Sequence, residues 1–458
     1  MDFRQRISDA LARSQARYTE VRLEVTTGSR VVYRGKRLET ATDTLDRGGF
    51  VRVLAREGGW GTATFNDLDQ LERKVTEALA CAEAIPAARV ELAATAPVTH
   101  EARAALEEDF RAVPLREKVA LLKELNELML GADEAIASTR AIYQDRMQTV
   151  YYGNSEGTWL VEERPLLDLY CIAEAVRGDD VQNGAEALTL ACSGFEAVRG
   201  RQELARAAAA RARDQLDAAP VKGGVYPVIL DPKLAGVFVH EAFGHLSESD
   251  FVFENEEAQK MMRLGRRFGR DLLNIADSGV ERPGDLPGSH AFDDEGVPMK
   301  RTQLVQDGVL VGRLHSRETA AKLREEPTGN ARAQDYNHKP LVRMRNTFIE
   351  PGQTSFADMI SDVKLGVYAC RSRGGMTCLG NFSFSSAHAF MIRDGQVAEP
   401  VRDVVLAGNL FETLQNVTAV GCDFTWERAG RCGKDGQSMP VAMGSPHIRI
   451  ENVVIGGA

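Results

Sequence analysis

The sequence predicts an α+β fold in three parts: a small N-terminal α/β domain, a central region of helices and strands, and a C-terminal, mainly β domain built around one buried helix. Three observations predict it. Apolar residues recur at helical spacing in several segments, and long stretches between them alternate apolar and polar residues with the period of a strand. Segments rich in proline, alanine or glycine interrupt these patterns near residues 97 and 220, so we expect domains at 1–97, 98–220 and 221–458.

The N-terminal domain should contain two strand pairs between two helices. Its first helix is amphipathic, with Ile7, Leu11 and Ala12 on one face. Small residues around Gly28 and around Gly59 predict turns inside two alternating segments. The expected elements are a helix at 3–18, strands at 18–26 and 30–42 with a turn at 27–29, strands at 48–55 and 58–65, and a helix at 67–84.

The central domain should combine helices with a long hairpin. Val119, Leu122, Leu125 and Leu128 lie at helical spacing, which predicts a helix with a buried face at 115–130. Residues 138–190 alternate with period two, and the polar residues at 154–157 predict a hairpin turn within them. An alanine-rich helix at 195–218 ends the domain.

The C-terminal domain should open with a short buried strand at 225–230, which leads directly into a helix. Asp231 is a good N-cap, and Pro232 suits the first helical position because its missing N–H would have no partner there. Glycines then punctuate the sequence, which favours strands and loops. The further elements expected are a helix at 254–268, a strand–turn–strand unit at 289–314, a helix at 318–323, loops at 328–344, a helix at 355–367, and strands at 376–392, 396–406 and 447–455.

Composition and charge exclude several classes of protein. The net charge is −10, and a general nucleic-acid-binding protein is usually basic, so we expect no nucleic-acid partner. No run of about 18 apolar residues occurs, and the N-terminus lacks the apolar core of a signal peptide, so we expect no membrane segment. The seven cysteines are sparse, odd in number and form no C-x-x-C pair, which fits free thiols in a reducing cytoplasm.

The predicted buried helix carries His240, Glu241 and His245 within an apolar run. Polar groups in an apolar helix cost free energy unless something satisfies them. Two imidazoles, with a carboxylate beside the first, are the groups that a zinc site with a general base requires. The helix is therefore a candidate metal site.

The spacing H-E-x-x-x-H is not the common one. Zinc peptidases often carry H-E-x-x-H, which puts both imidazoles on one helix face. In a regular helix, residues i and i+5 point about 140° apart. His240 and His245 could therefore share a metal only if the helix widens into a π-bulge or ends between them, and Gly244 eases such an irregularity. A buried helix with two hydrogen-bonded histidines explains these six residues alone equally well.

Cys432 is the candidate for a third ligand. It lies between glycines in the segment 429–438, which looks too glycine-rich for a packed core and is therefore expected to be a loop. A buried apolar role is the ordinary expectation for a cysteine, and it fits this position less well than the others. A thiolate would complete a His–His–Cys site with one position open for water, the catalytic pattern of zinc. Magnesium and calcium prefer oxygen ligands.

Two segments carry a resemblance to a known family. His240-Glu-Ala-Phe-Gly-His245, followed by Glu248 and Asp250, and Cys432-Gly-Lys-Asp-Gly-Gln-Ser438 resemble the signature segments of the TldD/PmbA family of zinc metallopeptidases, in its TldD branch. The similarity is dense from about residue 225 to the end and looser before it.

The resemblance implies a zinc ion held by His240, His245 and Cys432, with Glu241 as the general base that activates the zinc-bound water. It also implies cleavage of unfolded or flexible peptides inside the enclosed cavity of a two-chain assembly. The partner would be a second copy or a PmbA/TldE-like chain, and residues 221–458 would form the metallopeptidase domain.

Two alternatives stay open at this point. The chain could be a binding or assembly subunit with a structural metal, which would need a fourth ligand such as Glu248 or Asp250, although we expect these to be solvated helix-end carboxylates. It could also be a metal hydrolase that acts on a small-molecule amide. Candidates for a donor that stabilises the oxyanion are His338, Arg343 and His388, each of which we expect more readily in an ordinary hydrogen-bonding role.

Overall fold

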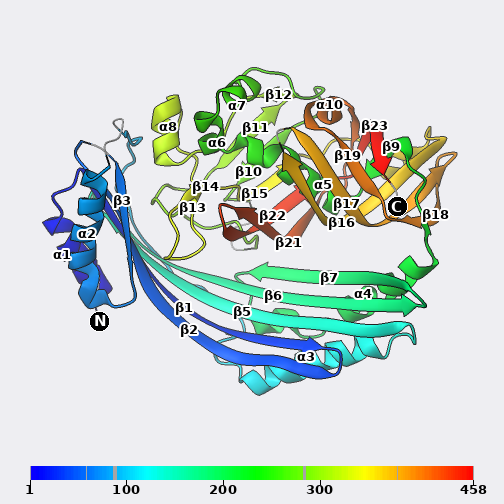
Figure 1. The fold of residues 1–458 in the computed structure, drawn as a ribbon, viewed down its shortest axis with the longest axis horizontal. Helices are drawn as coiled ribbons and strands as arrows, with labels where there is room; N and C mark the ends of the chain where they lie inside the picture. Colours follow the sequence, from blue (N-terminus) through cyan, green and yellow to red (C-terminus); the bar gives the residue numbers. More distant parts are fainter. Residues whose placement is uncertain (1, 58, 86–89, 282–284, 379, 457–458) are drawn as a thin grey trace.

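The longest strands of the chain form one curved sheet along one side of the molecule (Figure 1). The computed structural model describes every residue except 1, 58, 86–89, 282–284, 379 and 457–458. Helices cover one face of the long sheet, and the C-terminal domain lies against the other (Figure 1). The predicted α+β fold is confirmed.

The long sheet joins strands from both predicted N-terminal domains. Its order is β3-β2-β1-β5-β6-β4, and β7 pairs with a later part of β6 on the same edge as β4. The predicted boundary at residue 97 therefore lies between strands of one sheet. The strands are β1 Tyr18–Arg34, β2 Arg37–Leu54, β3 Trp60–Phe65, β4 Thr99–Ala102, β5 Ile136–Asn154, β6 Trp159–Arg177 and β7 Asp180–Ala191.

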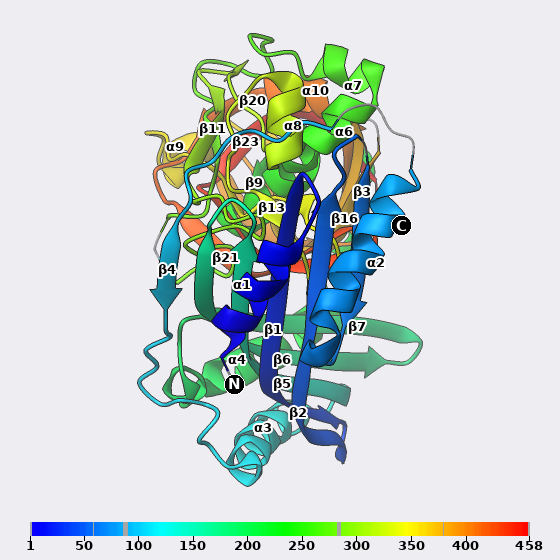
Figure 2. The ribbon, with the colours of Figure 1, turned by 90° about the vertical axis from the view of Figure 1, so that its left-hand side faces the viewer.

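Two pairs of helices pack on this sheet. The first pair lies at one end of the long strands (Figure 2), and the second pair closes an apolar core with Tyr143 and Leu167 of the sheet. The alanine face of α4 (Gln202–Asp217), the last of these four helices, lets it approach β6 and β7 closely. The helices are α1 Phe3–Arg13, α2 Leu71–Glu83, α3 Leu115–Leu130 and α4 Gln202–Asp217, with short turns η1 Leu68–Gln70 and η2 Phe195–Val198.

The turn predicted at residues 27–29 is wrong, because β1 runs through it without a break. The chain turns instead at Gly35, which has a φ of +53°. Gly28 serves close packing, since a Cβ there would lie 2.3 Å from the carbonyl oxygen of Asp145 on β5. The helix predicted at 3–18 ends earlier, at Arg13, because β1 begins at Tyr18.

In the C-terminal domain, helix α5 (Pro232–Val239) lies between two sheets. One sheet has the order β16-β9-β23-β19-β17-β18-β8, with β20 on β23 and a further pairing of β16 with β17; the other has the order β12-β11-β10-β15-β22-β21. The strands are β8 Ala219–Pro220, β9 Gly224–Leu230, β10 Ile275–Ser278, β11 Arg301–Gln306, β12 Val309–Leu310, β13 Ala331–Arg332, β14 Leu341–Val342, β15 Asn346–Ile349, β16 Leu365–Cys378, β17 Asn381–Arg393, β18 Gln396–Arg402, β19 Val405–Asn409, β20 Val417–Val420, β21 Thr425–Lys434, β22 Gln437–Ser445 and β23 Ile448–Gly456.

Short helices complete this domain, and two predicted ones are wrong in extent. The helix expected at 254–268 ends at Met261, and Gly265 beyond it has a φ of +86°. The helix expected at 355–367 ends at Ile360, because β16 starts at Leu365. The helices are α5 Pro232–Val239, α6 Ser249–Glu254, α7 Glu256–Met261, α8 Arg317–Leu323, α9 Phe356–Ile360 and α10 Leu410–Gln415, with η3 His240–Gly244 and η4 His245–Ser247.

No helix in the described part of the chain combines the length and the apolar character that crossing a membrane would take.

Candidate metal centre

The start and orientation of α5 follow from its sequence. The side chain of Asp231 accepts a hydrogen bond from the backbone N of Leu234 at 2.7 Å, and Pro232 occupies the first turn. The ring of Phe238 packs on Phe382 and Phe384 of β17, with centroid distances of 5.5 and 6.0 Å. This packing fixes the rotation of the helix and therefore the direction in which the next turn points.

That next turn is a π-helix, one of the two irregularities that would let both histidines reach one metal. η3 covers His240 to Gly244, and the backbone N of His245 bonds to the carbonyl oxygen of His240, five residues earlier. The wider turn brings residues i and i+5 to one side, so the two imidazoles lie with their centroids 5.4 Å apart. Gly244 is needed for packing, since a Cβ there would lie 1.9 Å from the sulfur of Met344.

Cys432 lies on β21, and the loop predicted around it is wrong. The segment forms a hairpin in which β21 pairs with β22, and Cys432 is 1% exposed. The guanidinium of Arg343 donates to the carbonyl oxygen of Cys432 at 2.5 Å and so fixes the strand. The thiol is therefore held rigidly, which suits a ligand better than a mobile loop does.

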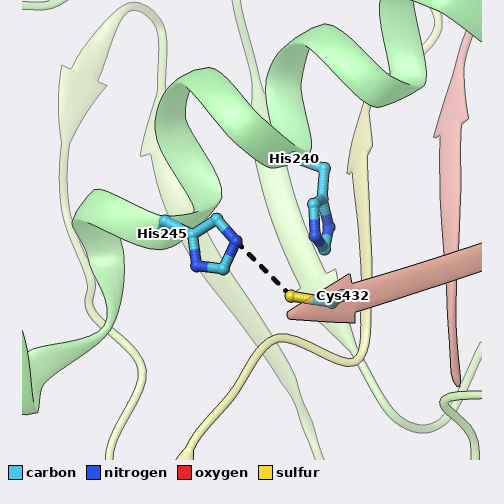
Figure 3. A group of neighbouring side chains, drawn as sticks. All are labelled: His240, His245 and Cys432. Atoms are coloured by element: carbon cyan, nitrogen blue, oxygen red, sulfur yellow. Dashed lines mark hydrogen bonds between the residues drawn. The ribbon is translucent and has the colours of Figure 1, made fainter. Parts of the chain in front are cut away.

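The structure brings His240, His245 and Cys432 together (Figure 3). Their ligand atoms lie within 4.8 Å of one another, and Cys432 Sγ is 3.4 Å from His245 Nε2. A tetrahedral zinc ion with bonds of about 2.0–2.3 Å separates its ligand atoms by roughly 3.3–3.8 Å. His240 is 1% exposed, and neither of its ring nitrogens has a hydrogen-bond partner among the described residues. A metal ion would satisfy it, so these residues fit a zinc ion.

Glu248 contacts the His245 imidazole on the side away from Cys432. Its Oε2 lies 3.2 Å from His245 Nδ1, and its Oε1 accepts from the backbone N of Met344 at 3.3 Å. Lys434 Nζ donates to Glu248 at 3.0 Å and to Asp250 at 2.7 Å. Glu248 is 1% exposed, so the expectation of a solvated helix-end carboxylate is wrong for it.

The charges around the group make the Cys432 thiol more acidic and the His245 imidazole more basic. Burial alone would raise the pKa of Cys432, but the nearby His240 and His245 outweigh it and hold the pKa at about 4. Burial would lower the pKa of His245, but the charge of Glu248, and then Cys432, raise it to about 11. At neutral pH Cys432 is therefore a thiolate beside the His245 imidazolium, and a metal that binds Nε2 would displace the proton held there, while Glu248 keeps the proton on Nδ1.

Glu241 lies on the open side of the group. Its side chain is 27% exposed, and its Oε2 lies 3.8 Å from His245 Nε2. It therefore reaches both solvent and the ring nitrogen that faces Cys432. A carboxylate at this place is available to take a proton from a molecule that approaches the group.

The other candidate residues have different roles. Glu248 faces the nitrogen of His245 that points away from Cys432, so it does not supply a fourth ligand here. Arg343 bonds to backbone oxygens of the hairpin, and His338 bonds to Asp335 at 2.8 Å. His388 lies on β17 opposite Cys370. Arg343 contacts the ligand group at the backbone oxygen of Cys432, and no hydrogen bond or ion pair of the described structure joins His338 or His388 to the three ligand residues.

Replacing Glu248 with glutamine should lower the affinity for zinc by about 10–100-fold, the usual cost of losing a carboxylate that orients a histidine ligand. Competition with a chromogenic chelator measures it. Asp250→Asn is the matched control, because it removes a charge beside Lys434 and keeps the contact between Glu248 and His245. Equal affinity in Glu248→Gln and the wild type would mean that Glu248 does not orient the ligand.

Three family models match successive parts of the chain. They are described as PmbA/TldA metallopeptidase domain 1, matched by residues 19–82, the PmbA/TldA metallopeptidase central domain, by 108–216, and the PmbA/TldA metallopeptidase C-terminal domain, by 223–457. Together they cover most of the sequence. The matched C-terminal part contains all three residues of the ligand group.

Individual proteins give a similar result. A metalloprotease of Synechocystis is 45% identical over 446 residues, which are 97% of this chain and 96% of the relative. A protein of Saccharolobus solfataricus named zinc metalloprotease TldD homolog is 32% identical over 326 residues, 70% of this chain and 72% of the relative. The structure of TldE from Thermococcus kodakarensis covers 98% of this chain and 99% of its own with a TM-score of 0.76; at 17% identity this likeness shows a shared fold.

Proposed function

Because the chain belongs to the TldD/PmbA family of metallopeptidases and is itself a metalloprotease, we propose that it is a zinc-dependent peptidase that cleaves unfolded or flexible peptides. The observation that carries the proposal is the convergence of His240, His245 and Cys432 beside Glu241. Three protein ligands leave one position of a tetrahedral metal open, as catalytic zinc requires. A structural zinc usually has four, and Glu248 is turned to the far side of His245.

We assign separate tasks to the residues around the site. A zinc ion bound there would act as a Lewis acid that polarises a peptide carbonyl and makes water more acidic. Glu241 accepts the proton of the attacking water, because its carboxylate is the acidic group on the open side. Glu248 and Lys434 keep His245 in one tautomer and orientation.

We propose that the peptide binds along β16. This strand pairs with β9 only at residues 367–369, and no strand of the described structure pairs with residues 371–377 on that side. β16 packs against both α5 and η3, so an added strand would run past Glu241. Gly374 leaves open space above the backbone, whereas Gly375 is required because a Cβ would lie 2.0 Å from Phe384.

We further propose a dimer, with a second copy or a TldE-like chain as the partner. In the single chain the side chains of Glu241 and His245 are 27% and 24% exposed, so an enclosed cavity would need a second chain to cover them. A cytoplasmic location belongs to the same proposal. It is supported by the cysteines Cys81, Cys171, Cys192, Cys370, Cys422 and Cys432, which are free.

Removal of the metal tests the function. The purified protein should hydrolyse a flexible fluorogenic peptide, lose this activity with a chelator, and regain it with about one equivalent of zinc per chain. A folded protein that contains the same peptide sequence in a strand or helix serves as the control and should resist cleavage. Peptide turnover that survives complete metal removal would contradict a zinc-dependent mechanism.

A further inference from the structure

A cleft of about 490 Å³ lies against α5, between the long sheet and the C-terminal domain. Lys233 and Val237 line it. Val237 lies one turn before Glu241 on the continuous helix of α5 and η3. The face of α5 that lines the cleft therefore leads toward the turn that carries Glu241.

Strand β21 contributes both to the cleft and to the metal site. Gly430 of β21 lines the cleft, and Cys432 follows two residues later on the same face of the strand. Six of the eighteen lining residues are glycine or alanine, which leave room for a chain: Gly184, Ala185, Ala187, Ala387, Ala429 and Gly430. The part of the cleft wall at Gly430 is thus two residues along β21 from Cys432.

Another part of the cleft is positively charged. Glu186, which is 6% exposed, bonds to Arg371 at 2.6 Å and also to Arg211. Lys233 pairs with Glu427 at 3.2 Å. Four basic and two acidic side chains line the cleft in all, which leaves two positive charges in excess: Arg211, Lys233, Arg371 and Arg373 against Glu186 and Glu427.

Two arginines of the cleft are in unfavourable states: one has a strained backbone and the other a buried polar atom without a partner. Arg371 has a φ of +52°, a conformation that residues other than glycine rarely adopt and that gathers at functional sites. Its backbone N donates to Asp231, the N-cap of α5, at 2.9 Å. The Nη1 of Arg211 is buried and has no hydrogen-bond partner among the described residues. Burial, and then the charges of Arg211, Arg371 and Arg373, lower the pKa of His388 to about 4.

We propose that this part of the cleft binds a carboxylate of the peptide substrate, either a glutamate or aspartate side chain or the C-terminal carboxylate. Guanidinium groups bind carboxylates with charge-assisted hydrogen bonds. Asp231 and Glu241 are ten residues apart, so the backbone of Arg371, which bonds to Asp231, lies roughly 15 Å from Glu241 along the helix. An extended peptide covers this distance in about four or five residues. The site therefore selects peptides with an anionic group at that distance from the cleaved bond, and the inference rests on the proposed peptidase function.

Binding to full-length Glu241→Gln protein tests the pocket without requiring cleavage. One flexible labelled peptide is made with glutamate or glutamine at successive positions, and with a C-terminal carboxylate or amide, and fluorescence anisotropy gives the affinities. We expect at least about a tenfold preference for an anionic form. Arg371→Gln and Arg373→Gln should reduce this preference to less than about threefold without weakening the neutral peptide. Arg393→Gln on β17, whose partner is the exposed Glu399, is the matched control.

The outcomes either distinguish a side-chain carboxylate from a C-terminal one or contradict the proposed pocket. A preference for glutamate at one position assigns a side-chain subsite, and a preference for the free C-terminus assigns a terminal one. Equal affinities for the acidic and neutral peptides, or a preference that both cleft variants retain, would overturn the proposal. Arg373 is exposed, so its variant stays informative if Arg371→Gln does not fold. Tight, arginine-dependent binding by a wild-type protein that cleaves none of the peptides would instead refute the peptidase function.

Discussion

Glu241→Gln should lose peptidase activity by about 10³-fold while it retains zinc, because a positioned general base contributes about 10²–10⁴-fold. Glutamine has nearly the same shape, so it keeps the packing of η3 and the places of His240 and His245. It cannot accept the proton of water as a carboxylate does. The effect should therefore appear in kcat rather than in KM, since binding of the peptide does not depend on this proton transfer.

Activity and metal content must be measured on the same preparation. Glu254→Gln is a suitable control, because Glu254 ends α6 at the exposed surface and contacts neither the histidines nor Cys432. Full zinc occupancy with no turnover is the expected result for Glu241→Gln. Turnover close to that of the wild type would remove Glu241 from the reaction, and loss of zinc would mean that its carboxylate holds the metal.

The local features of the site could be predicted from the sequence, because neighbouring residues determine them. Asp231 and Pro232 start α5 through the cap and the first-turn proline. The five-residue spacing of the histidines requires a widened turn if both bind one metal, and the structure has a π-turn there. Periodicity alone likewise predicted α3 and the hairpin of β5 and β6.

The wrong predictions of a turn at 27–29 and of a loop at 429–438 both rest on glycine. Gly28 and the glycines around Cys432 suggested a turn and a loop, yet they lie within strands. They let another chain segment approach: a Cβ on Gly430 would lie 2.4 Å from Met443 Cε. A glycine that permits close packing and one that permits a turn look the same in a sequence, and only the fold separates them.

The supporting residues could not be predicted, because their partners are distant in the sequence. Glu248 lies in a polar segment that suggests exposure, and its burial depends on Met344 and Lys434, 96 and 186 residues away. The cleft likewise combines Arg211 of α4, Glu186 of β7 and Arg371 of β16. No spacing rule connects such residues, so the charge of the cleft emerges only when the sheets pack.

Cys432→Ala should lower the zinc content from about one ion per chain to a small fraction, with a matching loss of activity, because it removes one of three ligands. The loss of affinity should exceed the about 10–100-fold expected for Glu248→Gln, since that change only disturbs a ligand. The pKa of about 4 makes Cys432 a thiolate at neutral pH, so the wild type binds zinc without first losing this proton. The free energy of unfolding in the presence of zinc should also be lower in Cys432→Ala, because zinc stabilises the folded chain that binds it.

Elemental analysis and thermal unfolding, each with and without added zinc, measure this effect. Cys171→Ala is the matched control: Cys171 is a fully buried cysteine on β6, so its replacement removes a thiol and leaves a small cavity without touching the ligand group. Added zinc should raise the unfolding temperature of the wild type and of Cys171→Ala, and it should leave that of Cys432→Ala nearly unchanged. Equal zinc content in Cys432→Ala and the wild type would show that the thiolate is no ligand, and the proximity of its sulfur to the His245 imidazole would then be an ion pair that stabilises the hairpin.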